Sequence, residues 1–248
     1  MYNSCDPSCE VTVSHGQVTG RHHREKGQSC EDVMLLKRSQ NCLFCGIADG
    51  QSGAEHGAKG GRACLQAVAD YVMETGIENI IHAPFPDELP CMVVQAFRKR
   101  LAALANATCS DLKAFASTLL TVSVDLETGE YVIFHLGDGY AIGTSHHGDA
   151  AVISSAENVL TPYMTWLTTS QNAVSHLRVT FGSMQDQKRI LLLSDGAVCF
   201  CRSRNILWRV KELLNTGSQA ELHSHLATSD PWDDATYVML DCVQITDP

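Results

Sequence analysis

The alternation of apolar and polar positions divides the chain into strand-like and helix-like segments. Residues 9–14, 32–37 and 42–48 have patterns typical of strands, and a short polar turn joins the last two. Apolar residues at helical spacing predict two helices, at about 57–76 and 88–108. The other predicted elements are strands within 115–153 with hairpin turns at 125–130 and 145–149, a strand over 189–200, helices over 203–217 and 218–228, and a closing strand over 233–245.

The order of these elements indicates the fold class. Strands, two helices, strands, helices and a final strand form an α+β pattern rather than an alternating βαβ pattern. We predict a single domain over residues 1–248. Its architecture is expected to be a four-layer α-β-β-α sandwich, in which two stacked, mainly antiparallel sheets are flanked by helices.

Three apolar runs each end in the dipeptide Asp-Gly, at Asp49, Asp138 and Asp195. A single Asp-Gly is most often a tight turn. Two acidic pairs, Glu31–Asp32 and Asp233–Asp234, also lie beside predicted strands. If these strand ends meet at one edge of stacked sheets, their carboxylates repel one another unless a cation lies between them. Oxygen ligands alone suit a hard ion such as Mg²⁺ or Mn²⁺.

Composition narrows the choice of partners and compartment. The 248 residues carry a formal net charge of −10, which argues against nucleic acid or an anionic membrane as the main partner. No apolar run approaches the ~20 residues that span a bilayer, and the polar N-terminus lacks the pattern of a signal peptide. We therefore expect a cytoplasmic protein. The cysteines in apolar runs, expected to be buried free thiols of a reducing compartment, are Cys42, Cys45, Cys64, Cys91, Cys199 and Cys242.

Six short motifs follow one another along nearly the whole chain. They are GQSCEDV with Glu31–Asp32, GIADGQSG with Asp49, ASTLLTV with Ala116–Thr118, LGDGYA with Asp138, LLLSDGA with Asp195 and DDATYVML with Asp233–Asp234. Each motif is weak alone. In this order and at this spacing they resemble the metal-dependent type-2C Ser/Thr protein phosphatases, most closely the bacterial members.

The resemblance implies an activity and its partners. The reaction is hydrolysis of phosphoserine and phosphothreonine esters on proteins, by a water that bridges two Mg²⁺ or Mn²⁺ ions, with a weaker third ion nearby. The partner is a phosphorylated protein, whose phosphate is added by an opposing Ser/Thr kinase. The family's variable flap corresponds to about residues 146–188. We read its stretch 158–170 either as a lid or docking surface, or as an ordinary surface loop anchored by Trp166.

The resemblance also implies roles for particular residues. Asp49 would bridge both ions, with the Gly50 carbonyl on the first, and Asp195 and Asp233 would bind the second. Asp49, Asp195 and Asp233 are therefore the implied catalytic residues. The remaining implied metal ligands are Glu31 or Asp32, directly or through a water, and Asp138 at the third ion.

The chain departs from the family pattern at two positions. Gly27 stands where many members carry an Arg that grips the substrate phosphate in a bidentate fork. Arg21, Arg24 and Lys26 lie close to Gly27, and we expect one of them, Arg24, to take that role. His23 is the other candidate, because some bacterial relatives resemble the pattern H…G…D in this segment. Gln51 stands where animal members place a histidine that acts as general acid. A metal-bound water or a nearby histidine would have to replace it.

Two other functions remain open at this point. The first is a regulatory or binding module that keeps the fold and has lost turnover, which the missing Arg motivates. The second is a phosphatase of a small phosphorylated metabolite.

Other suggestive residues have ordinary structural explanations. We expect His135, on a strand, to be a satisfied core histidine, and His22 and His23 to be exposed loop residues. Cys42 and Cys45 form a C-x-x-C pattern, but on a strand their side chains would point to opposite faces. We therefore do not expect them to bind zinc.

Overall fold

The computed structural model describes residues 9–158, 164–198 and 219–244. The predicted helix over 203–217 and Cys199 lie outside these residues. The described strands form two five-stranded sheets in which neighbouring strands are antiparallel. The first sheet has the order β1 (Cys9–Val18), β10 (Ala235–Gln244), β9 (Arg189–Leu193), β6 (Tyr140–Thr144) and β7 (Ala150–Ser154). The second has the order β2 (Val33–Arg38), β3 (Cys42–Ala48), β4 (Leu119–Asp125), β5 (Glu130–Leu136) and β8 (Arg178–Ser183).

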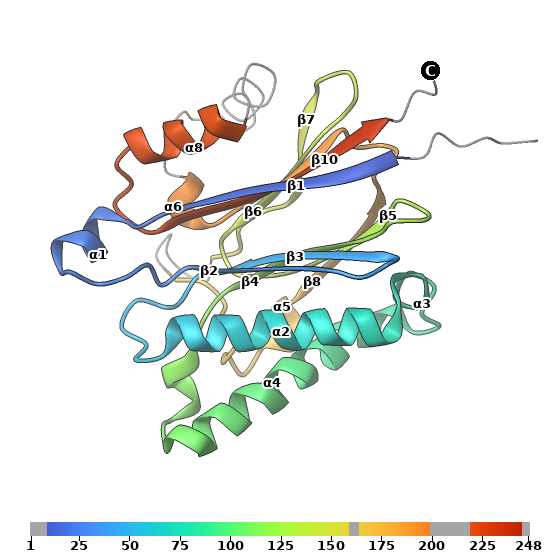
Figure 1. Cartoon of the computed structure of the whole chain (residues 1–248). Helices are drawn as coiled ribbons and strands as arrows, with labels where there is room; N and C mark the ends of the chain where they lie inside the picture. The colour runs from blue at the N-terminus through green and yellow to red at the C-terminus, as the bar shows by residue number, and fades with distance from the viewer. Residues whose placement is uncertain (1–8, 159–163, 199–218, 245–248) are drawn as a thin grey trace, which may run out of the picture.

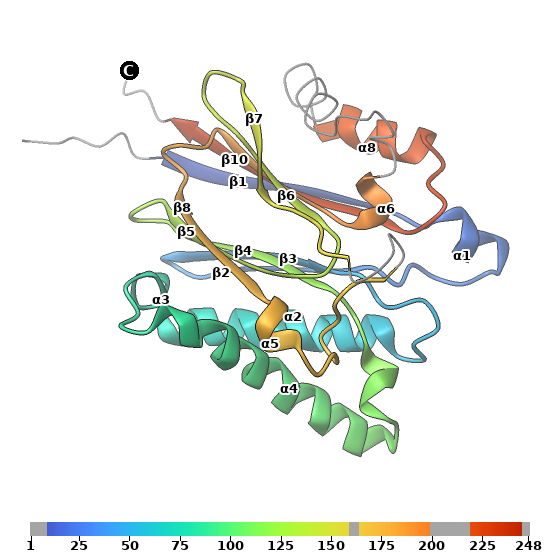
Figure 2. The same cartoon turned by 180° about the vertical axis from the view of Figure 1, so that it is seen from behind.

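Helices cover the outer faces of both sheets (Figure 1). Helices α2 (Gly57–Thr75) and α4 (Leu89–Thr108) lie against the second sheet, and Figure 2 shows the same layering from behind. Helices α6 (Asp195–Val198) and α8 (Gln219–Thr228) lie against the first sheet. The shorter described helices are α1 (Arg21–Glu25), α3 (Ile77–Ile81), η1 (Pro86–Glu88), η2 (Leu112–Phe115) and α5 (Ala173–His176). The predicted four-layer α-β-β-α sandwich is confirmed.

The side-chain alternation of β3 explains why this strand is apolar at nearly every position. Leu43, Cys45 and Ile47 point into the core between the two sheets. Phe44 and Ala48 point to the other face, where the helices pack. Both faces of the strand are therefore buried, as in the interior of any multilayer fold. Cys42 packs on the helix side while Cys45 lies between the sheets, so their predicted opposite orientation is confirmed.

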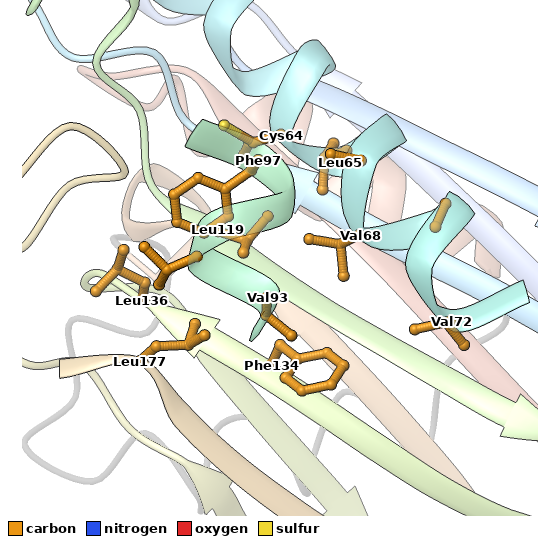
Figure 3. Packing of buried hydrophobic residues seen from close by; sticks show 14 of the residues in the cluster. Cys64, Leu65, Val68, Val72, Val93, Phe97, Leu119, Phe134, Leu136 and Leu177 are labelled. Atoms are coloured by element: carbon orange, nitrogen blue, oxygen red, sulfur yellow. The ribbon is translucent and has the colours of Figure 1, made fainter. Parts of the chain in front are cut away.

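The core beneath the helices fixes α2 and α4 on the second sheet. Leu65 and Val68 of α2 and Phe97 of α4 are fully buried against Leu119 and Phe134 of the sheet (Figure 3). Burying each such side chain contributes roughly 1.5–3 kcal/mol. This packing holds the sheet beneath the loop at residues 49–56, which runs from β3 to the first turn of α2.

Several predicted boundaries differ from the structure. The strand predicted over 189–200 ends at Leu193, and the chain turns into α6 at Asp195. Strand β1 extends to Val18 rather than to residue 14. The segment 154–188 contains β8, which the sequence did not predict. This strand is half-exposed along most of its length, so its apolar alternation is weak.

The cysteine prediction needs correction at some positions. Cys242 is disulfide-bonded rather than a free thiol. Which cysteines pair depends on the segments that the fold brings together, and the sequence does not show this. Cys42 and Cys91 are free but only half-buried, whereas Cys45 and Cys64 are free and buried as predicted. None of the described helices is long and apolar enough to cross a membrane.

Candidate active site

Four aspartates from separate parts of the chain line one pocket of about 490 Å³. Asp49 follows β3, Asp138 lies in the turn between β5 and β6, Asp195 is the first residue of α6, and Asp233 precedes β10. The remaining described lining residues are Gln51, Ser52, Thr118, Met164, Thr165 and Leu167. The sheet ends that carry these aspartates lie on the side of the molecule where α1 and α6 are drawn (Figure 1). The structure therefore brings together four of the residues predicted from the strand ends.

Two hydrogen bonds to Thr118 hold the main chain of Asp49. The Asp49 N–H donates to Thr118 Oγ1 at 2.9 Å, and the Thr118 N–H donates to the Asp49 carbonyl at 2.8 Å. Gly50 forms an isolated bridge with Ser117, so the pairing of β3 with the approach to β4 extends past the end of the strand. A Cβ on Gly50 would lie 2.8 Å from the Ala58 N atom at the start of α2. Glycine is needed here because the loop passes very close to the helix.

Asp195 is placed by the contact between β9 and β10. The Ser194 N–H donates to the Thr236 carbonyl at 3.0 Å, and Ser194 Oγ accepts from the Thr236 N–H at 2.9 Å. The Ser194 hydroxyl in turn donates to Asp32 Oδ2 at 2.9 Å. A Cβ on Gly196 would lie 2.0 Å from the Asp234 carbonyl oxygen. Glycine therefore lets the first turn of α6 approach the start of β10, which carries Asp233.

Three carboxyl groups in and beside the pocket, those of Asp195, Asp49 and Asp32, have raised pKa values. Burial, followed by the charges of Asp138 and Asp233, raises the pKa of Asp195 to about 7. Burial and the charges of Asp32 and Asp195 raise the pKa of Asp49 well above its usual range. The pKa of Asp32 is also raised, chiefly by burial. Like charges in a desolvated cluster destabilise one another, so a bound cation would relieve this repulsion.

The acidic pair Glu31–Asp32 lies behind the pocket rather than in its lining. Asp32 is 4% exposed, and its Oδ1 has no hydrogen-bond partner among the described residues. Glu31 Oε2 is also buried without a hydrogen-bond partner there. Asp234 lies beside the pair, and its carboxylate accepts the main-chain N–H groups of Gly20 and Glu31.

The donor set fits a hard divalent cation in its chemistry. The aspartates that line the pocket offer carboxylate oxygens, and nearby Glu31 and Asp32 each have one buried carboxylate oxygen without a hydrogen-bond partner in the described parts of the chain. In those same parts, no three Asp, Glu, His or Cys side chains are arranged so that they could hold an ion as they stand. The carboxylates would therefore have to turn toward a bound ion.

The residues expected to grip phosphate do not line the pocket. Arg24 donates to the Thr19 carbonyl and to Asp230 Oδ1. His23 was expected to be exposed, but it is 5% exposed, and its Nδ1 lies 2.9 Å from Asp234 Oδ2. The prediction of an exposed His23 was wrong because its buried partner, the carboxylate of Asp234, is far away in the sequence. No Lys or Arg lines the described part of the pocket.

A polar network that the sequence did not reveal ties the pocket wall to the Asp138 turn. Glu157 accepts hydrogen bonds from Arg178 Nη1 at 3.1 Å and lies 2.7 Å from His176 Nδ1. The Glu157 N–H and Arg178 Nη2 both donate to the carbonyl of Gly137, the residue before Asp138. Thr165, a lining residue, donates to the Glu157 carbonyl at 2.8 Å. These contacts join positions up to 41 residues apart, and no local motif signals them.

Trp166 anchors the same stretch. Its ring stacks on that of His176, with centroids 3.7 Å apart, and it packs against the core beneath the helices. Its neighbours Thr165 and Leu167 line the pocket. The described residues of this stretch are therefore anchored by Trp166 and form part of the pocket wall. Whether the stretch acts as a lid or docking surface stays a prediction, and residues 159–163 are not among those described.

Comparison with known proteins assigns the family. A family model described as protein phosphatase 2C matches residues 19–236. Since this span is most of the chain, the protein belongs to the protein phosphatase 2C family, as its motifs predicted. No curated protein sequence matches the chain.

Several solved structures share this fold. The Ser/Thr phosphatase Stp1 from Staphylococcus aureus has a TM-score of 0.71 at 16% identity, with 96% of each chain covered. The catalytic domain of the Ser/Thr phosphatase PstP, in complex with two manganese ions, has a TM-score of 0.65 at 15% identity, covering 94% of this chain and 98% of the other. RsbX in complex with magnesium has a TM-score of 0.61 at 15% identity, covering 95% and 98%. At these identities the likeness shows the fold.

Proposed function

We propose that the protein is a metal-dependent phosphatase that hydrolyses phosphoserine and phosphothreonine esters on proteins. The observation that carries the proposal is the convergence of Asp49, Asp138, Asp195 and Asp233 on one pocket within a protein phosphatase 2C fold. Fold alone does not determine function, but here the site contains the acidic ligands that the chemistry requires. The proposed partner is a phosphorylated protein, opposed by a Ser/Thr kinase.

The residues proposed to hold the metal are the four aspartates that line the pocket, together with Gly50 and the acidic pair Glu31–Asp32. Asp49 would bridge two ions, with the Gly50 carbonyl on the first and Asp195 and Asp233 on the second. Glu31 or the buried Asp32 would complete the shell, directly or through a water. Asp138 would hold a weaker third ion. When bound, Mg²⁺ or Mn²⁺ activates a water for in-line attack on phosphorus and neutralises the phosphoryl oxygens.

The chain itself contributes rigidity and the shape of the pocket. The hydrogen bonds between Asp49 and Thr118 fix one carboxylate on the sheet, and the Ser194 contacts fix the start of α6 beside β10. Thr165 and Leu167 form a wall on which a substrate peptide would lie. Rigid support of this kind is what a site needs to hold ligands in a productive geometry. Because no Lys or Arg lines the described part of the pocket, the phosphate would be held mainly by the ions.

The alternative is a regulatory module without turnover. It rests on the same observation, that no Lys or Arg side chain lines the described part of the pocket. A pocket that binds metal and does not hydrolyse a phosphoester would favour it. The third function, hydrolysis of a small phosphorylated metabolite, would be favoured by turnover of small esters that phosphopeptides do not inhibit.

The decisive experiment is hydrolysis of p-nitrophenyl phosphate and of a phosphothreonine peptide, each with Mn²⁺, Mg²⁺ or EDTA. Wild type would be compared with Asp195→Asn and with Asp186→Asn, a matched change at an exposed carboxylate outside the pocket. We expect turnover that requires metal, is lost in Asp195→Asn and is retained in Asp186→Asn. No turnover by a wild type that binds Mn²⁺ in calorimetry would overturn the proposal in favour of the regulatory module.

A further inference from the structure

His135 lies in the core between the two sheets with only one of its ring nitrogens satisfied. Its side chain is 1% exposed. Nδ1 lies 2.7 Å from Ser154 Oγ, on β7 of the facing sheet. Nε2, on the other side of the ring, has no hydrogen-bond partner in the described parts of the chain. Because an imidazole nitrogen is either a donor or an acceptor in each tautomer, Nε2 needs a polar partner whichever nitrogen carries the proton.

A small cavity adjoins this histidine. It measures about 10 Å³, and His135 shares its wall with Asp49, Asp138, Asp195 and Ser194. The rest of the wall is mostly aliphatic and includes Leu120 and Leu193. The cavity shares its aspartates with the larger pocket, so it lies directly behind the carboxylates of the site.

The size and chemistry of the cavity match a single water molecule. A volume of roughly 10–15 Å³ is about that of one water, and a buried water requires two to four polar partners. The ring of His135 lines the cavity, and its unsatisfied Nε2 is one available partner. The aspartate carboxylates and the Ser194 hydroxyl in the same wall supply the others. An apolar cavity of this size would stay dry, but this one contains an unsatisfied nitrogen and several oxygens.

We propose that one ordered water occupies this cavity and joins His135 Nε2 to the carboxylates of Asp49 and Asp195, so that His135 is a positioning residue of the site. The chain Ser154–His135–water–carboxylate then links the first sheet to ligands held at the ends of β3 and β9. Groups behind a metal ligand fix its orientation, and their removal typically weakens metal binding by about 10–100-fold. The water site stands independently of the proposed function, whereas its effect on metal affinity rests on it.

Two variants of His135 distinguish the role of Nδ1 from that of Nε2. Asn places a polar group near the position of Nδ1, so His135→Asn keeps a partner for Ser154 and loses the group that faces the cavity. Gln reaches the position of Nε2, so His135→Gln keeps the group that faces the cavity and loses the Ser154 contact. Ser154→Ala removes the contact on the opposite side without altering the ring.

Mn²⁺ affinity of the full chain, measured by calorimetry, is the first readout. We expect His135→Asn to bind Mn²⁺ about 10–100-fold more weakly than wild type, and His135→Gln to recover most of that loss. Ser154→Ala should bind within about threefold of wild type. Urea unfolding of each variant reports the purely structural cost, which we expect to be similar for Asn and Gln. Equal Mn²⁺ affinity of the two His135 variants would overturn the positioning role.

A high-resolution crystal structure of the wild type, without added metal, tests the water directly and needs no variant. Density for one water within hydrogen-bond distance of His135 Nε2 and a carboxylate oxygen would support the proposal. A dry cavity, or a carboxylate in direct contact with Nε2, would overturn it. This result does not depend on turnover, so a protein with the water and without phosphatase activity would refute the proposed function and leave this inference standing.

Discussion

The main-chain N–H of Glu31 donates a hydrogen bond of 2.5 Å to Asp234 Oδ2, although the two residues are 203 positions apart. The other oxygen of the same carboxylate accepts the Gly20 N–H at 2.7 Å. His23 Nδ1 lies 2.9 Å from Oδ2. Asp234 therefore joins the segment that carries the acidic pair to the start of β10, next to the pocket residue Asp233.

Removing this carboxylate should destabilise the fold. In Asp234→Ala, the main-chain donors of Gly20 and Glu31 lose their acceptor, and each buried unsatisfied donor costs about 1–3 kcal/mol. We expect the free energy of unfolding, measured in urea at pH 7, to fall by roughly 2–4 kcal/mol. Asp230→Ala is the control. Its side chain is 50% exposed and pairs with Arg21 and Arg24, so its loss should cost at most about 1 kcal/mol. Equal losses in the two variants would contradict a special role for Asp234.

The same contacts give the wild-type contribution of Asp234 a definite pH dependence. Burial alone would raise the pKa of Asp234, but the hydrogen bonds from Gly20 and Glu31 outweigh burial and lower it. A carboxyl group with a lowered pKa in the folded state stabilises the protein fully above its unfolded pKa. That stabilisation is lost as the pH falls through the lowered value.

The acidic strand ends could be predicted from the sequence because the signal for them is local. Leu43 to Ala48 is apolar on both faces of β3, and the run stops at Asp49–Gly50. The apolar runs before Asp138 and Asp195 stop in the same way. The stacking of two antiparallel sheets brings these strand ends together. The pattern of helices and strands predicted mostly antiparallel sheets covered by helices, and the stacking of two such sheets was predicted together with the resemblance to the phosphatase family.

What the sequence could not show depends on contacts between distant segments. The resemblance to bacterial family members suggested His23 as a phosphate ligand, whereas in the fold it contacts Asp234. Glu157 and Arg178 belong to a stretch with weak alternation, and their partnership arises only when β8 pairs with β5. The cavity behind the carboxylates likewise follows from the packing of side chains from several strands.

Repulsion within the site should make the metal-free protein less stable at neutral pH than in mild acid. Asp195, whose pKa is raised to about 7, binds its proton more tightly in the folded state than in the unfolded chain. Stability in EDTA should therefore fall as the pH rises from about 4 to about 7. Asp195→Asn keeps an oxygen that can accept the Gly196 N–H and removes the charge. At pH 8 it should be more stable than metal-free wild type by about 2–4 kcal/mol, measured by urea unfolding. If the free energies of unfolding of metal-free wild type and Asp195→Asn change in parallel between pH 5 and pH 8, this explanation is contradicted.

The hydroxyl of Thr118 should matter more than that of Thr121, a nearby threonine that is fully buried. Thr118→Val keeps the shape of the side chain but leaves the Asp49 N–H without its acceptor. We expect a loss of about 1–3 kcal/mol in the free energy of unfolding and weaker Mn²⁺ binding in calorimetry. The control is Thr121→Val on β4, the strand that begins just after Thr118, where the hydroxyl makes only a 3.5 Å contact with the Phe134 carbonyl. If Thr121→Val weakens Mn²⁺ binding as much as Thr118→Val, the specific support of Asp49 is refuted.

The Glu157 network should control how the pocket wall meets a peptide rather than the chemical step. Glu157→Gln removes the charge that Arg178 and His176 share, while the main-chain bond to Gly137 remains. If the altered wall at Thr165 and Leu167 binds a phosphothreonine peptide about 1 kcal/mol more weakly, KM for that peptide would rise roughly fivefold. The kcat for p-nitrophenyl phosphate, which is too small to need the wall, should stay within about twofold of wild type. Glu127→Gln, at an exposed carboxylate paired with Asn41 in a hairpin turn, provides the control and should change neither value. If Glu157→Gln lowers kcat for both substrates equally, the network instead positions Asp138, because Arg178 also binds the carbonyl just before that residue.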